Sequence, residues 1–362
     1  MVRIGLVGLI AGGHSGIPRY AAALTNALDH VAPEFPDLSL RLLTTERGAR
    51  ESGTRSIPVE LATGLFGGAN AGPRRIAGEQ IRARRTDVDL LHFFDLTGPV
   101  LARHRAFVTT IHDAAVSHGF ERARMVHKRL LQPWAIRRAK ATIAVSAFAR
   151  DEAVRAFGAD PARIHVVHPG PGLVPTGDGE VPAERSPYLL YVGNLAAHKN
   201  LPFLVRAFGA AHVEERLLLV GGRGERFEEV REAVETSPAR DRIEIRRDVS
   251  DPEVDRLYRG ASVLLLPSRY EGFGFTALEA MARDCPVVAS DIPALREVSG
   301  DGAWLLPPDD ESAWADAMRR LTSDRGLRDA MRHRGEATVR RYSWERTARH
   351  VCELFRQLGS GG

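Results

Sequence analysis

Short apolar runs alternate with helical patterns along almost the whole chain, and this alternation constrains the fold more than any other feature. The runs are rich in Val, Ile and Leu, and the stretches between them repeat apolar residues with helical period. This order is typical of βαβ units, in which successive strands lie parallel in one sheet. The expected strands are residues 2–9, 38–44, 90–94, 106–111, 141–145, 164–167, 188–192, 216–220, 243–246, 263–267 and 286–290. The expected helices include residues 19–31, 125–139, 201–211, 226–235, 251–260, 275–283 and 312–323.

The alternation is interrupted once, between the first six expected strands and the last five. The interruption reads PGPGLVPTGDGEVPAERSP, and its density of Pro and Gly excludes a helix or a central strand. A chain of 362 residues is also long for one domain and suits two. The expected divisions are an N-terminal domain at 1–170, a linker at 171–187, a C-terminal domain at 188–342 and a last helix at 343–358. We expect that helix, with Ser343 as its N-cap, to pack back towards the N-terminal domain.

Composition restricts the partners and the compartment. The net charge is +4 and the pI is about 9.3, with arginines dense at 74–85 and 122–140. A basic face can attract anionic substrates, lipid headgroups or nucleic acid, but we interpret these arginines as a solvated surface. No nucleic-acid-binding motif is present in the sequence. Cys285 and Cys352 form neither a disulfide framework nor a metal-type spacing, which favours a reducing cytoplasm. No apolar run reaches the length of a bilayer span, and the N-terminus has no secretory signal, so at most a weak peripheral contact with the inner membrane face is expected.

The strongest chemical signal lies at 262–297, where a buried apolar strand leads into a glycine loop and then a helix. The loop holds Glu271, Gly272 and Gly274, and the helix is expected to begin near Phe275 or Thr276. The N–H groups and the dipole of a first helical turn favour an anion such as phosphate. Glu271 can face a polyhydroxylated ligand, and Glu279 can accept two hydrogen bonds from a vicinal diol such as ribose. Two carboxylates would repel a phosphate unless hydroxyl groups partner each of them, and a nucleotide sugar supplies both sets.

The block PSRYEGFGFTALEAMARDCPVVAS resembles the signature of retaining glycosyltransferases of family 4, which have the GT-B fold. That signature holds two glutamates with seven residues between them. The residues that match it are Glu271, Gly272, Phe273, Gly274, Leu278, Glu279 and Ala280. The resemblance implies that Glu271 contacts hydroxyls of the donor sugar and that Glu279 contacts the ribose. It also implies that the backbone at Phe275 and Thr276 holds the diphosphate, in an α/β fold of two Rossmann-like domains whose parallel sheets face a central cleft.

A second segment, YVGNLAAHKNLPFLVRAF, brings a lysine to the end of another expected strand. The strand ends near Gly193, and Lys199 in the following loop could neutralise a leaving diphosphate. The segment resembles the family's Y-V-G…K-N/G-L block, in which a basic pair binds the donor phosphates, and Lys199 matches one member of that pair. The other member stays open. Many relatives have arginine where this chain has Asn194, others where it has His198, and Arg223 could supply the missing charge.

The N-terminal segment GLIAGGHSGIPRY places glycines after the first expected strand. It does not fit the G-x-G-x-x-G dinucleotide fingerprint, and no acidic ribose ligand closes the next strand, which argues against a NAD-dependent dehydrogenase. Through Gly13, Gly16 and Arg19 the segment resembles the family's G-G-x-G-x-x-R/K loop. That resemblance implies a place across the cleft from the donor diphosphate. His14 is expected either to fill the loop or to contact the acceptor.

A fourth segment, FVTTIHDAAV, places His112 and Asp113 at the end of a strand, where parallel strands present their ligands. His112 resembles the histidine that family members place beside the transferred sugar. Asp113 is expected to orient the imidazole or to bind the acceptor. Ser146 is interpreted as a helix N-cap rather than a nucleophile.

These residues predict a retaining glycosyltransferase that moves a hexosyl or deoxyhexosyl group from a nucleotide-diphosphate sugar to an acceptor hydroxyl. The donor is expected mainly in the C-terminal domain and the acceptor mainly in the N-terminal domain. Lys199, helix amides and either Arg223 or Arg19 would stabilise the leaving diphosphate, which would accept the acceptor's proton during front-face attack. No cofactor and no metal ion is expected, because no D-x-D-type acidic pair stands in a suitable loop.

Two alternatives remain, namely a nucleotide-sugar epimerase of the same fold and a non-catalytic nucleotide-binding subunit. No acid/base set of the kind that an epimerase needs stands out in the sequence. The joint presence of four residues argues against a non-catalytic subunit, namely His112, Lys199, Glu271 and Glu279. The Lys-Asn form of the second segment resembles relatives that handle mannose or deoxysugars, so GDP-mannose and a dTDP-deoxysugar are the first donors to try. The arginine-rich composition is typical of a high-GC bacterium. The expected acceptor is a cell-surface glycan, a lipid-linked glycan or a natural product of the antibiotic type.

Overall fold

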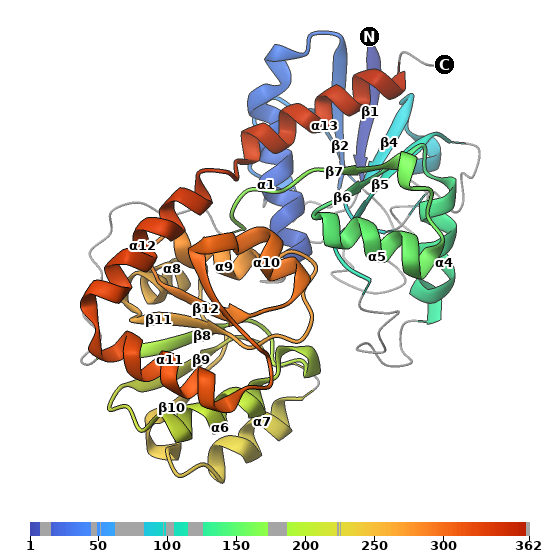
Figure 1. Ribbon diagram of the computed structural model, residues 1–362. Helices are drawn as coiled ribbons and strands as arrows, with labels where there is room; N and C mark the ends of the chain where they lie inside the picture. The colour runs from blue at the N-terminus through green and yellow to red at the C-terminus, as the bar shows by residue number, and fades with distance from the viewer. Residues whose placement is uncertain are drawn as a thin grey trace. The chain divides into compact units, whose positions relative to one another are not determined.

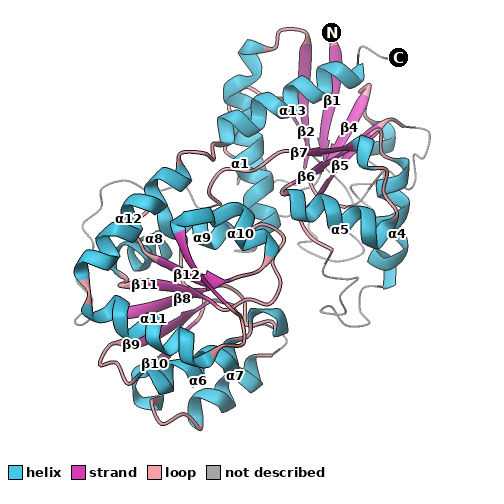
Figure 2. Ribbon diagram, viewed as in Figure 1, coloured by secondary structure: helices cyan, strands magenta, loops and turns pink. Residues whose placement is uncertain are grey.

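The computed structural model of the chain divides into two compact units, Met1–Gly170 with Tyr342–Gly362 and Pro171–Arg341. It describes residues 1–7, 16–44, 49–50, 52–61, 83–96, 98, 105–114, 126–172, 187–222, 224 and 226–359, without the side chains of 126–130. Of the expected linker, residues 171, 172 and 187 are described, and they belong to the second unit. Each unit is built on a parallel sheet covered by helices, which confirms the predicted α/β class (Figure 2).

The first unit has a sheet of order β3-β2-β1-β4-β5-β6-β7, in which every neighbouring pair is parallel (Figure 1). Its strands are β1 (Val2–Val7), β2 (Leu38–Thr44), β3 (Val59–Leu61), β4 (Leu90–Phe93), β5 (Phe107–Ile111), β6 (Ala141–Ala144) and β7 (Ile164–Val166). Its helices are α1 (Gly16–Val31), α4 (Val126–Arg138), α5 (Ala147–Phe157) and α13 (Trp344–Gly359), with short 3₁₀ turns at Ala32–Glu34 and Pro161–Arg163. Ser146 caps α5, since its Oγ accepts a hydrogen bond from the Ala149 amide at 2.9 Å, as the sequence predicts.

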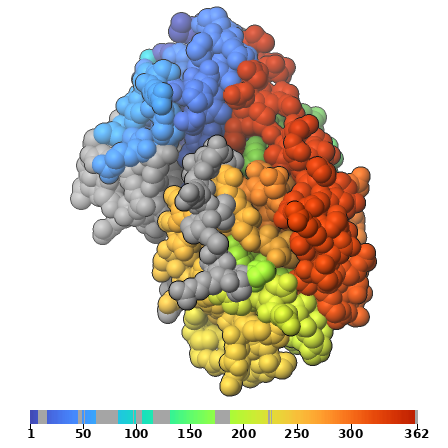
Figure 3. All heavy atoms as spheres, turned by 90° about the vertical axis from the view of Figure 1, so that its left-hand side faces the viewer, coloured from blue at the N-terminus to red at the C-terminus, as the bar shows by residue number. Residues whose placement is uncertain are grey.

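The last helix, α13, returns to the first unit and packs against α1 (Figure 3). Its apolar face is buried through Val351, Cys352 and Phe355. Arg349 forms a bidentate ion pair with Glu34, with both N–O distances at 2.8 Å. Although α13 follows the second unit in the chain, it therefore completes the core of the first.

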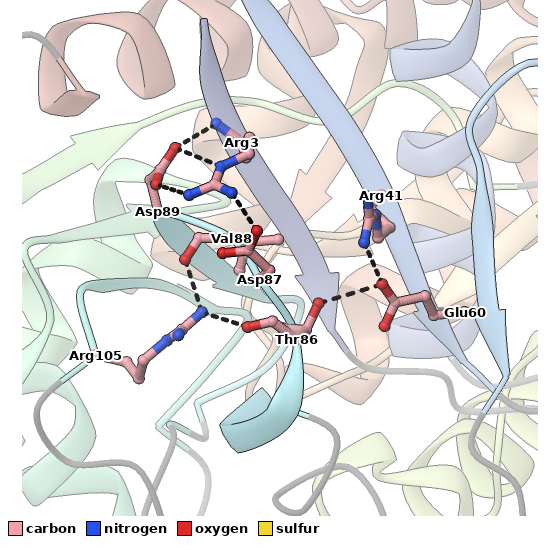
Figure 4. A network of polar contacts seen from close by, with 8 residues as sticks. All are labelled: Arg3, Arg41, Glu60, Thr86, Asp87, Val88, Asp89 and Arg105. Atoms are coloured by element: carbon pink, nitrogen blue, oxygen red, sulfur yellow. Dashed lines mark hydrogen bonds and ion pairs between the residues drawn. The ribbon is translucent and has the colours of Figure 1, made fainter.

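A network of polar contacts joins β1, β2 and β3 to the segments before β4 and β5 (Figure 4). Arg3, near the start of β1, donates through its backbone amide and its guanidinium to Asp89 and also pairs with Asp87. These hydrogen bonds lower the pKa of Asp89 to about 2. Arg105 donates to the carbonyl oxygens of Thr86 and Val88. The contacts at Arg3 therefore tie the start of β1 to the segment that leads into β4.

The second unit repeats the same construction with the strand order β10-β9-β8-β11-β12-β13, again parallel throughout. Its strands are β8 (Tyr188–Val192), β9 (Arg216–Val220), β10 (Ile243–Arg246), β11 (Val263–Leu266), β12 (Val287–Ser290) and β13 (Ala303–Leu306). Its helices are α6 (Leu201–Ala211), α7 (Phe227–Glu235), α8 (Asp251–Gly260), α9 (Phe275–Met281), α10 (Pro293–Ser299), α11 (Glu311–Ser323) and α12 (Arg325–Val339). Short 3₁₀ turns lie at Ala197–Lys199, Arg240–Arg242 and Gly300–Gly302. The largest buried side chain is Trp314 on α11, which packs against Phe203 of α6 beneath the sheet.

The structure corrects the sequence prediction at several elements. The short strands β3 and β13 and the helices α10 and α12 were not expected. Gly16 is the first residue of α1 rather than part of the preceding loop. The helix expected at 275–283 ends at Met281, because the chain turns at Asp284 with a positive φ of 55°.

Candidate functional site

Lys199 and Glu271 meet at the carboxyl ends of two adjacent strands of the second unit. Lys199 closes the 3₁₀ turn that follows β8, and Glu271 lies in the loop that follows β11. Their Nζ and Oε1 atoms are 2.6 Å apart, and the side chains are 16% and 17% exposed. Ser268 also donates a hydrogen bond to Oε1 of Glu271, at 2.7 Å. Burial alone would raise the pKa of Glu271, but the charge and hydrogen bond of Lys199, with Ser268 and His198, lower it, so the carboxylate is ionised.

Further bonds hold the loops after β8, β11 and β13 together. The Arg269 amide donates to the His198 carbonyl at 2.8 Å, and the Arg269 side chain pairs with Asp309 at 2.6 Å. Asn200 directly precedes α6 and donates through its side chain to the Pro308 carbonyl at 3.1 Å. These contacts fix the spacing between the two loops that carry Lys199 and Glu271.

Hydrogen bonds also order the chain where β8 leads into the loop that carries Lys199. The Gly193 amide donates to the Val220 carbonyl at 2.9 Å, which extends the pairing of β8 with β9 by one residue. The Asn194 carbonyl accepts a hydrogen bond from the Tyr191 hydroxyl at 2.8 Å. Burial, and secondarily the charge of Glu271, raise the pKa of Tyr191. The Tyr191 hydroxyl therefore stays neutral and donates to the Asn194 carbonyl.

The loop from Gly272 to Gly274 leads directly into α9. Gly274 has a φ of +111°, a conformation that side chains disfavour, and its carbonyl accepts the first helical bond, from Ala277 at 3.0 Å. The rings of Phe273 and Phe275 lie edge to face with 5.0 Å between centroids. The amides of Phe275 and Thr276 precede the first helical hydrogen bond, so the helix begins where the sequence predicts, and their role in holding a diphosphate stays a prediction.

Glu279 lies inside α9 and is only 2% exposed. Its Oε2 accepts a hydrogen bond from the Tyr258 hydroxyl at 2.9 Å. Its Oε1 lies beside Gly172, where an added Cβ would come within 2.6 Å of that oxygen. The second glutamate of the motif is therefore more deeply buried than the first.

His112 follows β5 in the first unit, and its surroundings determine its protonation. Nε2 lies 2.8 Å from the Phe94 carbonyl, and the ring packs edge to face on Tyr20 with 4.6 Å between centroids. Burial lowers the pKa of His112, although the Phe94 carbonyl and the charges of Asp113 and Asp95 oppose this. The neutral imidazole is therefore favoured at pH 7.

The other predicted site residues are distributed between the units. Gly16 and Arg19 lie on the first turns of α1, and Asp113 directly follows His112. Gly13, His14 and Arg223 lie outside the described residues. Within the second unit, the structure thus brings Lys199 and Glu271 into direct contact and places Glu279 on the helix that follows.

Three supporting residues were missed by sequence reasoning. Ser268 bonds Glu271, Tyr258 bonds Glu279, and Tyr20 packs on His112. Ser268 could have been noticed, because it stands three residues before Glu271 in the same loop. Tyr258 and Tyr20 lie on other helices, and a single sequence carries no sign of their contacts.

Comparison with known proteins identifies the family. Residues 15–171 match Glycosyltransferase Family 4, and residues 178–338 match the group 1 glycosyl transferases. The O-antigen chain mannosyltransferase B of Escherichia coli is 30% identical over 69% of this chain and 70% of its own length. This chain belongs to glycosyltransferase family 4. A D-inositol 3-phosphate glycosyltransferase of Xylanimonas cellulosilytica is 34% identical over 60% of this chain, which spans 57% of that protein.

Solved structures agree with the family on the fold. Sucrose-phosphate synthase from Thermosynechococcus elongatus has a TM-score of 0.74 at 20% identity, covering 100% of both chains. HepE from Anabaena, in complex with UDP and glucose, has a TM-score of 0.76 at 18% identity, covering 99% of this chain and 100% of its own. The predicted GT-B fold is therefore confirmed.

The described part of the chain was compared with the requirements of a membrane-spanning helix and of a metal site through its helices and its His, Cys, Asp and Glu side chains. None of these helices combines the length and the apolar character that a membrane span requires. Within the same part of the chain, no three His, Cys, Asp or Glu side chains group closely enough to hold a metal ion. A metal-independent reaction stays a prediction.

Proposed function

We propose that this family 4 glycosyltransferase moves a hexosyl or deoxyhexosyl group from a nucleotide-diphosphate sugar to an acceptor hydroxyl, with retention of anomeric configuration. The observation that carries the proposal is the Lys199–Glu271 pair, which lies at the carboxyl ends of β8 and β11. In open parallel sheets this edge is where ligands bind. Glu279, on the helix after the same loop, adds a second carboxylate for the ribose.

Lys199 supplies the charge that the leaving group needs. As the bond to the anomeric carbon breaks, negative charge develops on the diphosphate, and a positioned ammonium stabilises it. Glu271 shares that ammonium, so a bound diphosphate would compete with Glu271 for Lys199. The carboxylate keeps the lysine in place through a non-covalent ion pair. The ammonium can therefore exchange this ion pair for one with a phosphate group.

Glu271 is suited to binding hydroxyl groups rather than to moving protons. Its pKa is lowered, so it is an ionised and weakly basic acceptor near neutral pH. A sugar hydroxyl can donate to it, but proton removal from an acceptor alcohol needs a stronger base. We therefore infer that the departing phosphate oxygen takes the acceptor's proton, while the acceptor oxygen bonds to the anomeric carbon on the same face.

His112 supports binding of the transferred sugar from the first unit. Because the Phe94 carbonyl can only accept, Nε2 carries the proton and Nδ1 keeps its lone pair. Nδ1 can then accept a hydrogen bond from a sugar hydroxyl. Asp113, Gly16 and Arg19 remain proposed contacts of the acceptor or the diphosphate, and Gly13, His14 and Arg223 remain proposals from the sequence.

GDP-mannose is the first donor to test, followed by a dTDP-deoxysugar and UDP-glucose. The matched relatives include O-antigen chain mannosyltransferases and D-inositol 3-phosphate glycosyltransferases, and the HepE structure contains UDP and glucose. These names support a bacterial glycan acceptor, lipid-linked or soluble, while a natural-product acceptor stays a second choice. We propose a cytoplasmic location, with a weak contact at the inner membrane face if the acceptor is lipid-linked.

Calorimetric titration with GDP, UDP, dTDP and ADP tests the donor site. One nucleotide should bind, and Glu279→Ala should raise its Kd at least tenfold, since hydrogen bonds to a charged group contribute about 1.5–3 kcal/mol each. Glu336→Ala, which removes an exposed helical glutamate of the same unit, is the matched control. With the working donor, NMR of the product gives the anomeric configuration. Unchanged nucleotide affinity and turnover in Glu279→Ala would show that the donor assignment is wrong, and an inverted product would show that retention is wrong.

A further inference from the structure

A buried polar cluster joins α8 to α9, which lie side by side in the second unit (Figure 1). We call this the α8–α9 cluster. Its members are Asp255, Tyr258, Arg259, Glu279 and Arg283. Of the five, only Glu279 has a role in the proposed function. The other four need an explanation, because burying a charged pair is costly unless its geometry is well satisfied.

The cluster immobilises Tyr258. Its ring is fully buried, and the guanidinium of Arg283 lies 5.5 Å from the ring centre. Arg283 also donates to the Glu279 backbone carbonyl at 2.7 Å and pairs with Asp255 at 2.6 Å. Asp255 is held in turn by Arg259 at 2.9 Å. A shift of the Glu279 backbone would break its bond to Arg283, and a shift of the tyrosine ring would disturb the contact with the same guanidinium.

The Glu279 carboxylate is confined on both of its oxygens. The Tyr258 hydroxyl donates to Oε2 at 2.9 Å, and the backbone of Gly172 passes Oε1 so closely that a methyl group there would lie 2.6 Å away. The side chain is 2% exposed, so little water reaches it. The orientation of the carboxylate is therefore determined by the protein.

We propose that Tyr258 is a positioning residue that holds Glu279 in the one orientation suited to a ribose diol, and that it thereby makes the donor site select ribonucleoside diphosphates over their 2′-deoxy counterparts. The inference rests on the proposed function, in which Glu279 binds the ribose. It changes the order of donors given for the proposed function, because it places GDP-sugars and UDP-sugars ahead of dTDP-sugars.

The physical reason is the cost of an unsatisfied buried acceptor. A fixed carboxylate in a dry site loses a full hydrogen bond when the 2′-hydroxyl is absent, and sites built to bond a hydroxyl reject analogues that lack it. A carboxylate free to rotate can turn to the remaining 3′-hydroxyl or to water, so it discriminates less. Tyr258 decides between these two cases.

The test compares Tyr258→Phe with Tyr188→Phe in calorimetric titrations against GDP and 2′-deoxy-GDP, and against UDP and 2′-deoxy-UDP. Tyr188 is an ideal control, because it is equally buried and its hydroxyl donates to the carbonyl of Leu257, next to Tyr258, at 2.8 Å. Wild type and Tyr188→Phe should both bind the ribonucleotide at least tenfold more tightly than the deoxynucleotide. Tyr258→Phe should weaken binding of the ribonucleotide roughly tenfold and bring the two affinities within about threefold.

Gly172→Ala gives a second route that leaves Tyr258 intact. The added methyl group should displace the carboxylate and lower the same discrimination, whereas Gly209→Ala, which has room for a methyl group, should not. Thermal unfolding of each variant shows whether it is folded, and loss of general stability alone does not change the ratio of two affinities.

The outcomes separate the inference from the function on which it rests. In one outcome, wild type prefers the ribonucleotide and Glu279→Ala loses that preference, but folded Tyr258→Phe and Gly172→Ala both keep it. This outcome would overturn the positioning role and leave the proposed function standing. If wild type binds no nucleotide, or if Glu279→Ala binds as wild type does, the proposed function fails and takes this inference with it.

Discussion

Nε2 of His112 lies 2.8 Å from the carbonyl oxygen of Phe94, and this contact determines which ring nitrogen carries the proton. The carbonyl has no hydrogen to give, so Nε2 must donate and Nδ1 must carry the lone pair. Phe94 is itself placed by β1, since its amide donates to the Val7 carbonyl at 3.1 Å. The tautomer of His112, which follows β5, is therefore determined by its contact with Phe94, which β1 in turn holds in place.

The neutral state of His112 predicts an acid limb in the pH profile of kcat/KM. Burial lowers the pKa of His112, so the ring stays neutral at pH 7 and is protonated only at lower pH. Protonation removes the Nδ1 lone pair, and activity should fall as the pH decreases below the ordinary histidine value of about 6.5. In His112→Asn we expect lower activity at pH 7.5 and a shallower acid limb. His165→Asn, which removes another histidine of the first unit with a lowered pKa, should keep the full limb. An unaltered limb in His112→Asn would contradict the assignment.

Replacing Lys199 by methionine should lower kcat by about 10²–10³, the usual effect of removing one group that stabilises transition-state charge. The methionine keeps the apolar stem, so packing changes little. Steady-state kinetics with the working donor measure the effect, and Lys140→Met, at an exposed lysine, should have wild-type rates. A rise in KM with an unchanged kcat would mean that Lys199 binds the donor but does not assist departure of the diphosphate.

His92 makes the first unit sensitive to acid. It is completely buried against Thr110, and burial, with a smaller contribution from His112, lowers its pKa to about 3. The unfolded chain binds a proton near pH 6.5, so between pH 6.5 and 3 it holds more protons than the folded protein, and stability decreases as the pH falls. The expected slope is at most about 1.4 kcal/mol for each pH unit.

Urea unfolding at pH 7 and pH 5 measures this dependence. His92→Gln should be less stable at pH 7, because a well-packed side chain changes, but its stability should vary less between the two pH values. His30→Gln, at an exposed histidine of α1, should keep the wild-type difference. Equal pH differences in wild type and His92→Gln would show that His92 is not the sensitive group.

Asp29 holds the segment before β3 through a nearly buried carboxylate. It accepts hydrogen bonds from the amides of Arg55, Ser56 and Ile57 and from the Ser56 hydroxyl. Although burial would raise the pKa of Asp29, these hydrogen bonds lower it. Asp29→Asn replaces one carboxylate oxygen by an amide NH₂ group, which would face N–H and O–H groups that also donate. The substitution should lower the free energy of unfolding by about 2 kcal/mol. The exposed Asp37→Asn should cost little, and equal midpoints for the two variants would contradict the assigned role.

The order of strands and helices was largely predictable, because each buried parallel strand is a continuous apolar run. β8, β9, β10, α6 and α8 have the predicted bounds. The missed elements lack such a signal. β13 is half-buried along most of its length at the edge of its sheet, β3 has three residues, and α12 buries only Met331, Gly335 and Thr338.

The sequence by itself determined the two-sheet α/β architecture and the spacing of Glu271, Glu279 and Lys199 within their motifs, because strand–loop–helix patterns are local and leave periodic signals. Only the tertiary structure decided that Lys199 bonds Glu271 across 72 positions, that Tyr258 holds Glu279 and that Phe94 sets the tautomer of His112. These contacts depend on which strands become neighbours and on how two helices align. Such long-range pairings follow from burial of the whole core, and no local pattern of residues encodes them.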